Sequence, residues 1–322
     1  MDQALAPSSG HLPPLYASDA ATSRCVIEFF TANINNIHTR KLYARAAVDF
    51  AVWCARHGIA HLGQIQPVHV AAHIQELQRH LSIPSVKVRL AALRTLFDWL
   101  VLGHVLPANP SSAVRGPKHV VRKGRTPVLT AEETRLLLES IDTSSLIGLR
   151  DRALIALMTY TFARVGAAAE KMRIEDVYIQ GRRIWVRLHE KGGKRHEMPC
   201  HHKLEAYLHD YMEARRIRTE PPPGSKDWLF PTVHLRTACF TDRPMSQADV
   251  YRMVRRRAWR AGIQTRIGCH TFRATGITEY LRNGGKLEIA QQMANHESAR
   301  TTGLYDRRND QVSLDEVERI LI

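Results

Sequence analysis

The sequence predicts a mainly α-helical protein of two domains, the second of which also carries a small antiparallel sheet. Three observations predict this fold class. Apolar residues recur at helical spacing over the first hundred positions, a proline-rich basic segment follows, and one strand-like alternation stands at 183–199. We therefore expect a flexible tail at 1–17, a helical domain at 18–106, a basic linker at 107–127 and a second domain at 128–322.

The first domain is predicted to contain four helices and no strand. They are expected near 24–30, at 40–57, at 67–80 and after Pro84. Gly58 and Gly103 are typical C-terminal stops, and Pro67 suits the first turn of a helix. The apolar face of the second helix would hold Leu42, Ala46, Phe50, Val52 and Trp53, and that of the fourth Val88, Leu93, Leu96, Phe97 and Leu100.

The segment 107–127 cannot continue a helix, because it contains four prolines and two glycines. Its basic residues are Arg115, Lys118, Arg122, Lys123 and Arg125. Each of these charges alone is as well explained by a solvated tether. Their number favours a linker that follows a phosphate backbone.

In the second domain, Thr130 and Glu133 form a capping-box pattern that opens a helix, and another helix is expected near 150–161. Residues 183–189 alternate as a strand, a Gly192-Gly193 turn follows, and 195–199 returns as a second strand. Lys191 and Lys194 flank this turn. The chain after Lys203 is predicted to be helical.

The charge balance favours an anionic polymer as partner. The formal net charge is +15, and residues 1–126 contribute 14 basic against 6 acidic residues, so both domains are basic. Positive charge shared by two domains suits nucleic acid held between them, whereas solubility is the plainer explanation.

The remaining composition predicts a soluble protein of the cytoplasm, associated with the nucleoid. Five cysteines form no C-x-x-C pair and are odd in number, which favours a reducing compartment. No basic-then-apolar leader stands at the start, and no apolar run is long enough for a membrane span. We expect no membrane partner, no metal and no cofactor.

The C-terminal third contains the most informative motifs. Cys-His-Thr-Phe-Arg-Ala-Thr-Gly stands at 269–276, Ala-Asn-His at 294–296 and Thr-Thr-Gly-Leu-Tyr-Asp at 301–306. Upstream lie an arginine in Tyr-Thr-Phe-Ala-Arg-Val-Gly and the hairpin lysine. This order resembles the tyrosine recombinase (phage integrase) family, and is similar to Xer and Cre recombinases. The catalytic residues that the resemblance implies are Arg164, Lys191, His270, Arg273, His296 and Tyr305.

The resemblance implies a four-helix, SAM-like core-binding domain and a mixed α/β catalytic domain that close on duplex DNA. Two guanidinium groups, Arg164 and Arg273, suit a phosphate that gains charge during attack. His270 can exchange a proton near neutral pH, and His296 would add a hydrogen bond. Tyr305 would then be the nucleophile that forms a 3′-phosphotyrosine ester, with Lys191 as the acid for the leaving 5′ oxygen.

Several choices stay open at this level. Lys194 lies across the same turn as Lys191 and could be the acid instead. The family commonly has an acidic residue three positions after the first arginine, where this chain has Ala167, so Arg164 must be oriented by something else. Asp176 matches an acidic family position but could equally be a turn residue. Cys200 with His201-His202 is better explained as a solvated loop than as a metal site.

Two further segments are expected to make contacts. A basic helix around 250–260 is predicted to bury Val250, Met253 and Val254 and to offer arginines to DNA. The candidate DNA-binding residues are Lys194, Arg252, Arg255, Arg256, Arg257, Lys118, Arg122 and Lys123. A capping box at 313–316 opens an amphipathic C-terminal helix, which would dock on a neighbouring copy in a homotetramer on two specific DNA sites.

The biological role is expected to be integration of a mobile element, through a Holliday junction. We expect no separate arm-binding domain, like that of the large phage integrases, before the first helical domain. The alternatives are Xer-like dimer resolution, relaxation like that of type IB topoisomerases, and a DNA-binding accessory protein without catalysis.

Overall fold

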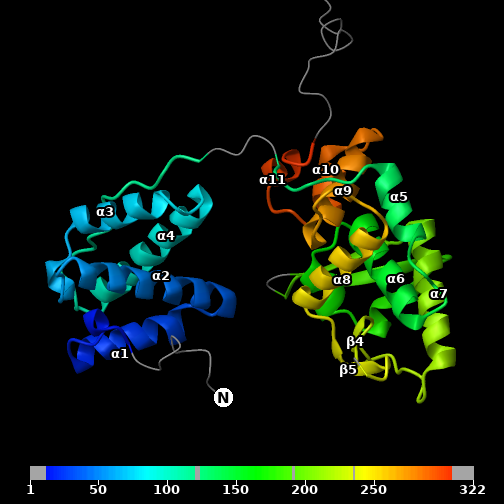
Figure 1. The fold of residues 1–322 in the computed structure, drawn as a ribbon, viewed down its shortest axis with the longest axis horizontal. Helices are drawn as coiled ribbons and strands as arrows, with labels where there is room; N and C mark the ends of the chain where they lie inside the picture. The colour runs from blue at the N-terminus through cyan, green and yellow to red at the C-terminus, as the bar shows by residue number, and fades with distance from the viewer. Residues whose placement is uncertain (1–11, 120–123, 191–192, 235, 307–322) are drawn as a thin grey trace, which may run out of the picture. The chain divides into compact units, whose positions relative to one another are not determined.

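The computed structural model describes residues 12–119, 124–190, 193–234 and 236–306, which fall into two compact units divided after Val120. The first unit is helical, and the second combines helices with two small sheets (Figure 1). This confirms the predicted fold class. Lys191, Arg122, Lys123 and the predicted C-terminal helix lie outside the described residues.

The first unit contains α1 (Ala20–Glu28), α2 (Ile37–Arg56), α3 (Pro67–Gln78) and α4 (Ile83–Leu102). Its core is built from aromatic and aliphatic side chains of these helices, among them Phe50, Val70, Val86, Phe97 and Leu100, all with 0% exposed surface. The four predicted helices are confirmed within a few residues of their expected bounds. A π-helical turn, Phe29–Asn33, extends α1.

The prediction of the buried face is wrong for three residues of this unit. Leu42, Val52 and Val88 are exposed, at 54%, 50% and 39%. Leu42 stands one turn before the first buried residue of α2, Ala46, and the other two lie on the outer faces of their helices. Apolar spacing alone did not distinguish these positions from their buried neighbours.

The ends of this unit are more ordered than the sequence indicated. Pro14–Tyr16, expected within the loose tail, form a 3-10 turn, and the Tyr16 hydroxyl donates to the Ala47 carbonyl over 3.1 Å. In the segment predicted as linker, Pro110, Ser111 and Val114 are buried. Arg94 donates to the carbonyl oxygens of Ser111 and Val114, so the start of that segment is fastened to α4.

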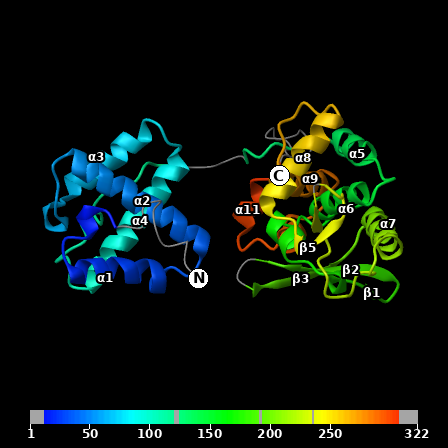
Figure 2. The same cartoon turned by 60° about the horizontal axis from the view of Figure 1, so that its bottom comes forward.

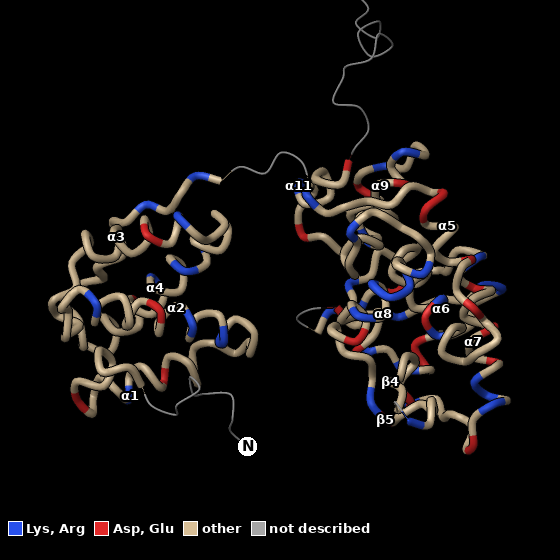
Figure 3. The backbone as a smooth tube through the Cα atoms, viewed as in Figure 1, with Lys and Arg blue, Asp and Glu red and all other residues tan. Residues whose placement is uncertain are grey.

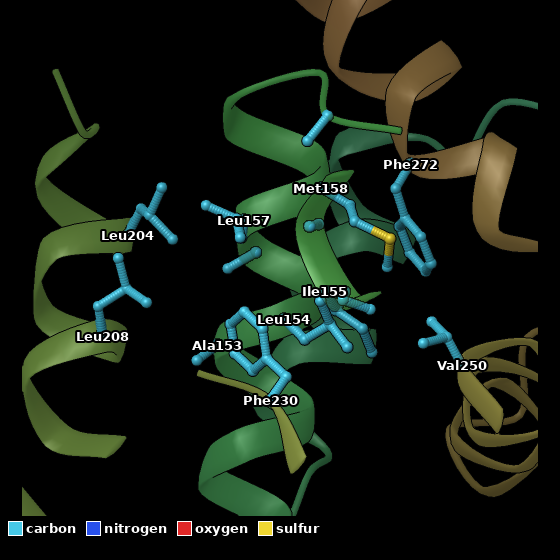
Figure 4. Close-up of a cluster of buried hydrophobic side chains, with 14 of the residues drawn as sticks. Ala153, Leu154, Ile155, Leu157, Met158, Leu204, Leu208, Phe230, Val250 and Phe272 are labelled. Atoms are coloured by element: carbon cyan, nitrogen blue, oxygen red, sulfur yellow. The ribbon is translucent and has the colours of Figure 1, made fainter. Parts of the chain in front are cut away.

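The second unit is organised around α6 (Leu146–Tyr160), which is buried along almost its whole length. Figure 4 shows Leu204 and Leu208 of α7 (His202–Arg218) on one side of α6, and Phe272 of α9 (Cys269–Arg282) with Val250 of α8 (Gln247–Arg260) on the other. Helices α5 (Ala131–Glu139), α10 (Leu287–Met293) and α11 (Ala299–Gly303) complete the unit. The predicted capping box of α5 is present, since Glu133 N donates to Thr130 Oγ1 over 3.0 Å.

The sheet content exceeds the prediction. Strands β2 (Arg183–His189) and β3 (Arg195–Pro199) have the expected bounds, and β1 (Val177–Gln180) adds a third antiparallel strand (Figure 2). A second hairpin, β4 (Pro231–Val233) with β5 (Phe240–Pro244), corrects the prediction that the chain after Lys203 is wholly helical. Strands this short give almost no period-two signal.

A buried charge cluster joins α6 to α8. Asp151 is fully buried and accepts from Arg150 Nη2 over 2.7 Å and from Arg257 Nη2 over 2.8 Å. Arg150 also donates to the Pro231 carbonyl over 2.7 Å, which attaches β4 to the same cluster. Arg257, predicted to contact DNA, is therefore an internal ion-pair partner. That prediction is wrong because the stripe of arginines does not reveal which one faces a buried acid.

We expect Asp151→Ala to lower the free energy of unfolding of the second unit by about 3–5 kcal/mol, because two guanidinium groups would remain buried without their counter-charge. Urea unfolding of the full chain measures this. The matched control is Asp210→Ala, which removes a half-exposed partner of Arg152 and should change the value by at most about 1 kcal/mol. Equal effects of the two substitutions would contradict a structural role for the cluster.

Candidate active site

Helix α9 carries two of the predicted catalytic residues and approaches the end of α6 very closely. Gly276 permits this approach: a Cβ atom there would lie 2.1 Å from the carbonyl oxygen of Thr159 and 2.7 Å from the ring of Phe162. No side chain fits at such separations. Gly276 thus sets the spacing between α9 and the segment that leads from α6 to Arg164.

Arg273 lies at the centre of the site and is only 1% exposed. Its Nη1 donates to the Phe162 carbonyl, and its Nη2 donates to the Ala294 carbonyl over 2.5 Å. Phe162 adopts a left-handed backbone conformation, with φ of 55°. One guanidinium group therefore holds together α9, the segment before Arg164 and the turn before His296.

The donors of Arg273 are not all used. Its Nε is buried and has no hydrogen-bond partner among the described residues. Burial, together with the nearby Arg164, lowers the pKa of Arg273 to about 10, so the side chain stays charged at neutral pH. A buried cation with a spare donor is a suitable partner for an anion.

Tyr305 is packed into this region with 8% of its surface exposed. Its phenolic oxygen lies 2.9 Å from Nε2 of His270. Its backbone carbonyl accepts a hydrogen bond of 3.0 Å from Thr278 Oγ1 on α9. The phenol is therefore placed against a potential proton acceptor by contacts on both its side chain and its backbone.

His270 has the electrostatic properties of a base. Burial lowers its pKa below the ordinary value, and the charges of Arg273 and Arg164 lower it further. The imidazole is thus neutral at pH 7 and can accept the phenolic proton of Tyr305 through Nε2.

The ring of His296 lies nearly parallel to that of Tyr305, with ring centroids 5.9 Å apart and planes 9° from parallel. Its Nδ1 lies 2.9 Å from Thr302 Oγ1. Burial, followed by the charges of Arg273 and Arg164, lowers its pKa to about 3. When Nδ1 accepts from Thr302, the neutral ring carries its proton on Nε2 and becomes a hydrogen-bond donor.

Arg164 follows α6 and keeps 40% of its side chain exposed. Its Nη1 donates to Glu190 Oε2 over 2.7 Å, and Glu190 is almost fully buried. Ala167, three positions later, is buried and offers no polar group. The orientation that Ala167 cannot provide comes from Glu190, a residue that the sequence analysis missed. Its only sequence signal was an acid directly before Lys-Gly-Gly.

The structure thus brings together Arg164, His270, Arg273, His296 and Tyr305. Two cations and a histidine donor surround a phenol that contacts a neutral base, which is suited to nucleophilic attack on an anionic ester. Lys191, the sixth predicted residue, lies outside the described residues. Within those residues, no cluster of His, Cys, Asp and Glu has metal-binding geometry.

The remaining residues singled out from the sequence lie outside the cluster around Tyr305. Lys194 pairs with Glu297 over 3.0 Å, and both side chains are exposed. Asp176 is buried, caps a 3-10 turn and lies 2.9 Å from His189 Nε2. His201 stacks on Tyr160 and caps α7, while Cys200 is buried, so this segment is not the solvated loop that was predicted.

The basic surface of the second unit lies on α8, where Figure 3 shows closely spaced Lys and Arg segments. Arg252, Arg255 and Arg256 are exposed, whereas Val250, Met253 and Val254 are buried as predicted. Lys118 is exposed in the first unit. Of the helices in the described ranges, none has the length and apolar character to cross a bilayer.

A sequence profile of the phage integrase family matches residues 127–312. The chain belongs to this family. It is therefore a tyrosine recombinase, an enzyme of site-specific DNA recombination, and the cluster around Tyr305 lies within the matched region.

Individual relatives agree with this assignment. A tyrosine recombinase of Pseudothermotoga lettingae is 26% identical over 88% of this chain and 92% of the relative. The XerH recombinase bound to a palindromic difH substrate in a post-cleavage complex has a TM-score of 0.71 and 20% identity, covering 96% of this chain and 90% of that chain. A lambda integrase tetramer bound to a Holliday junction has a TM-score of 0.66 and 19% identity, and the match covers 91% of this chain and 79% of that chain.

We expect the rate of covalent attachment to DNA to show no decline at about pH 6.5, the ordinary pKa of histidine. The decline should begin only well below that pH, where His270 becomes protonated. If neutral His270 is the base, its lowered pKa keeps that form populated in mildly acidic solution. Single-turnover rates between about pH 5 and about pH 8 measure this. His270→Gln should be slower by about 10²-fold and lack the acid limb.

Circular dichroism at each pH is the control, because His73 in the first unit has a pKa lowered to about 4 by burial, and its protonation would destabilise that unit. An acid limb centred at or above about pH 6.5 in the folded wild type would contradict the role of His270 as a neutral base.

Proposed function

We propose that this recombinase cuts and rejoins duplex DNA at specific sites through a covalent 3′-phosphotyrosine bond to Tyr305. The observation that carries the proposal is the 2.9 Å contact between the Tyr305 phenol and His270 Nε2, adjacent to Arg164 and Arg273. A catalytically silent accessory protein would have no need for this arrangement of a neutral base, a phenol and two cations.

In the proposed reaction, Arg164, Arg273 and the Nε2 of His296 bind the non-bridging oxygens of the scissile phosphate. The Tyr305 oxygen attacks phosphorus while its proton passes to His270. The bond from phosphorus to the 5′ oxygen breaks, and that oxygen takes a proton from Lys191 or, as the alternative, from Lys194. The ester conserves the energy of the broken bond, so rejoining by a 5′ hydroxyl requires neither ATP nor metal.

Binding of the duplex is proposed to involve both units. The exposed arginines of α8, Arg252, Arg255 and Arg256, would contact phosphates or base edges, and Lys118 with the basic linker would follow the backbone. Arg257 is not among the proposed DNA contacts, because its guanidinium group is buried against Asp151.

We propose that four copies assemble on two sites and exchange strands through a Holliday junction. The likeness to the lambda integrase tetramer supports this proposal. A cavity of about 660 Å³ on the second unit, lined by residues of α5, α6 and α9 such as Leu138, Tyr160 and Tyr280, is a candidate site for the apolar C-terminal segment of a neighbouring copy. This would couple cleavage to assembly.

Integration of a mobile element is the proposed biological role. The likeness to XerH, crystallised on its difH substrate, favours dimer resolution as a second candidate. Recombination assays distinguish them: resolution of two directly repeated sites on one plasmid supports the second, and insertion into an unlinked site supports the first. Relaxation of supercoiled DNA without sequence preference would instead indicate topoisomerase-like activity.

We expect Tyr305→Phe to bind a suicide substrate, nicked beside the cleavage site, without becoming covalently attached, whereas the wild type is trapped. The substitution removes the nucleophilic oxygen and leaves the ring that packs against His296. Denaturing gel electrophoresis measures trapping. Tyr178→Phe, which removes a hydroxyl that donates to Glu197 on the sheet, is the control and should be trapped like the wild type. Equal trapping of Tyr305→Phe would remove Tyr305 from the mechanism.

Deletion of residues 312–322 is expected to weaken tetramer formation on paired sites and to lower cleavage, because a docking segment would be lost. Sedimentation of DNA complexes and the trapping assay measure the two effects. Unchanged assembly together with unchanged cleavage would refute docking by the C-terminal segment.

A further inference from the structure

Glu190 stands at the end of β2, where its side chain and its backbone contact different parts of the site. Its carboxylate accepts from Arg164 Nη1 over 2.7 Å, and its side chain is only 4% exposed. Its backbone N–H donates to the Lys194 carbonyl over 2.8 Å, and its own carbonyl accepts from Lys171 Nζ over 3.3 Å. The residue therefore connects Arg164 to the turn between β2 and β3.

The asymmetry of the ion pair indicates a role beyond stability. A buried carboxylate is unfavourable unless a cation compensates it, so Glu190 strongly favours the conformation in which Arg164 faces it. Arg164, in contrast, remains 40% exposed and uses only Nη1 for this contact among its several N–H donors. One edge of the guanidinium group is fixed, while its other donors make no hydrogen bond within the described ranges and can meet an anion.

The charge of Glu190 also reaches the rest of the site. Burial and the nearby Arg164 lower the pKa of Arg273, and the charge of Glu190 partly opposes this effect. Glu190 likewise opposes the lowering of the His196 pKa by burial. In the enzyme without DNA, the carboxylate thus offsets the repulsion between the two arginines that must converge on one phosphate.

We propose that Glu190 is a positioning residue for DNA cleavage: it fixes the guanidinium group of Arg164 so that the free edge meets a non-bridging oxygen of the scissile phosphate. This rests on the proposed function, in which Arg164 binds that phosphate. Preorganisation of a long side chain before attack lowers the barrier, because its conformational freedom is not lost during the reaction.

The test compares Glu190→Gln with Glu197→Gln in single-turnover cleavage of a nicked suicide substrate. Glu197 also pairs with an arginine of the same sheet, Arg187, but does not contact Arg164. We expect Glu190→Gln to lower the cleavage rate by about 10- to 100-fold. DNA affinity should stay equal or become tighter, because a negative charge is removed, and Glu197→Gln should behave as the wild type. A merely structural role would lower affinity and thermal stability together.

Two further measurements identify the route of action. In an Arg164→Ala background, Glu190→Gln should cause no additional loss, since its target is absent. A substrate with a neutral methylphosphonate at the cleavage site should narrow the difference between wild type and Glu190→Gln, because the oxygen charge that Arg164 binds is gone.

The inference is overturned if Glu190→Gln cleaves at the wild-type rate, or if it slows Arg164→Ala by the same factor as it slows the wild type. Failure of the proposed function has a different signature: Arg164→Ala would then cleave normally, or Tyr305→Phe would still be trapped. Thermal unfolding of each variant shows that the compared proteins are folded.

Discussion

The buried guanidinium group of Arg273 is the constraint on which the site depends. It is bonded to two backbone carbonyls, those of Phe162 and Ala294, and these carbonyls begin the segments that lead to Arg164 and His296. Backbone carbonyls satisfy donors but do not cancel a full positive charge. The same side chain therefore fixes the geometry of the site and leaves it electropositive, ready for a phosphate.

The protonation state of His270 and His296 follows from this placement of charge. Arg273 and Arg164 both lower the pKa of His270 and of His296, in addition to the effect of burial. A positive charge nearby disfavours protonation of a histidine, so the same cations that attract a phosphate also keep His270 neutral. Phosphate binding and proton acceptance are therefore compatible within one cluster.

Sequence reasoning predicted the parts of the fold that local patterns determine. The bounds of β2 and β3 and the capping box of α5 were correct because alternation and capping act within a few residues. The grouping of His270, Arg273, His296 and Tyr305 was predicted from their order. What could not be predicted depends on partners that are distant in the sequence. Arg257 is buried in an ion pair with Asp151, which lies on another helix. Glu190 accepts a hydrogen bond from Arg164, which lies 26 positions before it.

The position of Tyr305 is another consequence of distant contacts. The preceding helix, α11, has only five residues and is too short to be stable alone. The segment is held instead by Thr278, which donates to the Tyr305 carbonyl, and by Gly124 N, which donates to the Leu304 carbonyl over 2.9 Å. A Cβ atom at Gly124 would lie 2.5 Å from that carbonyl oxygen, so glycine is required for the approach. The proposed nucleophile, Tyr305, is thus positioned by α9 and by the chain just before α5, and a movement of either would displace the phenol from His270.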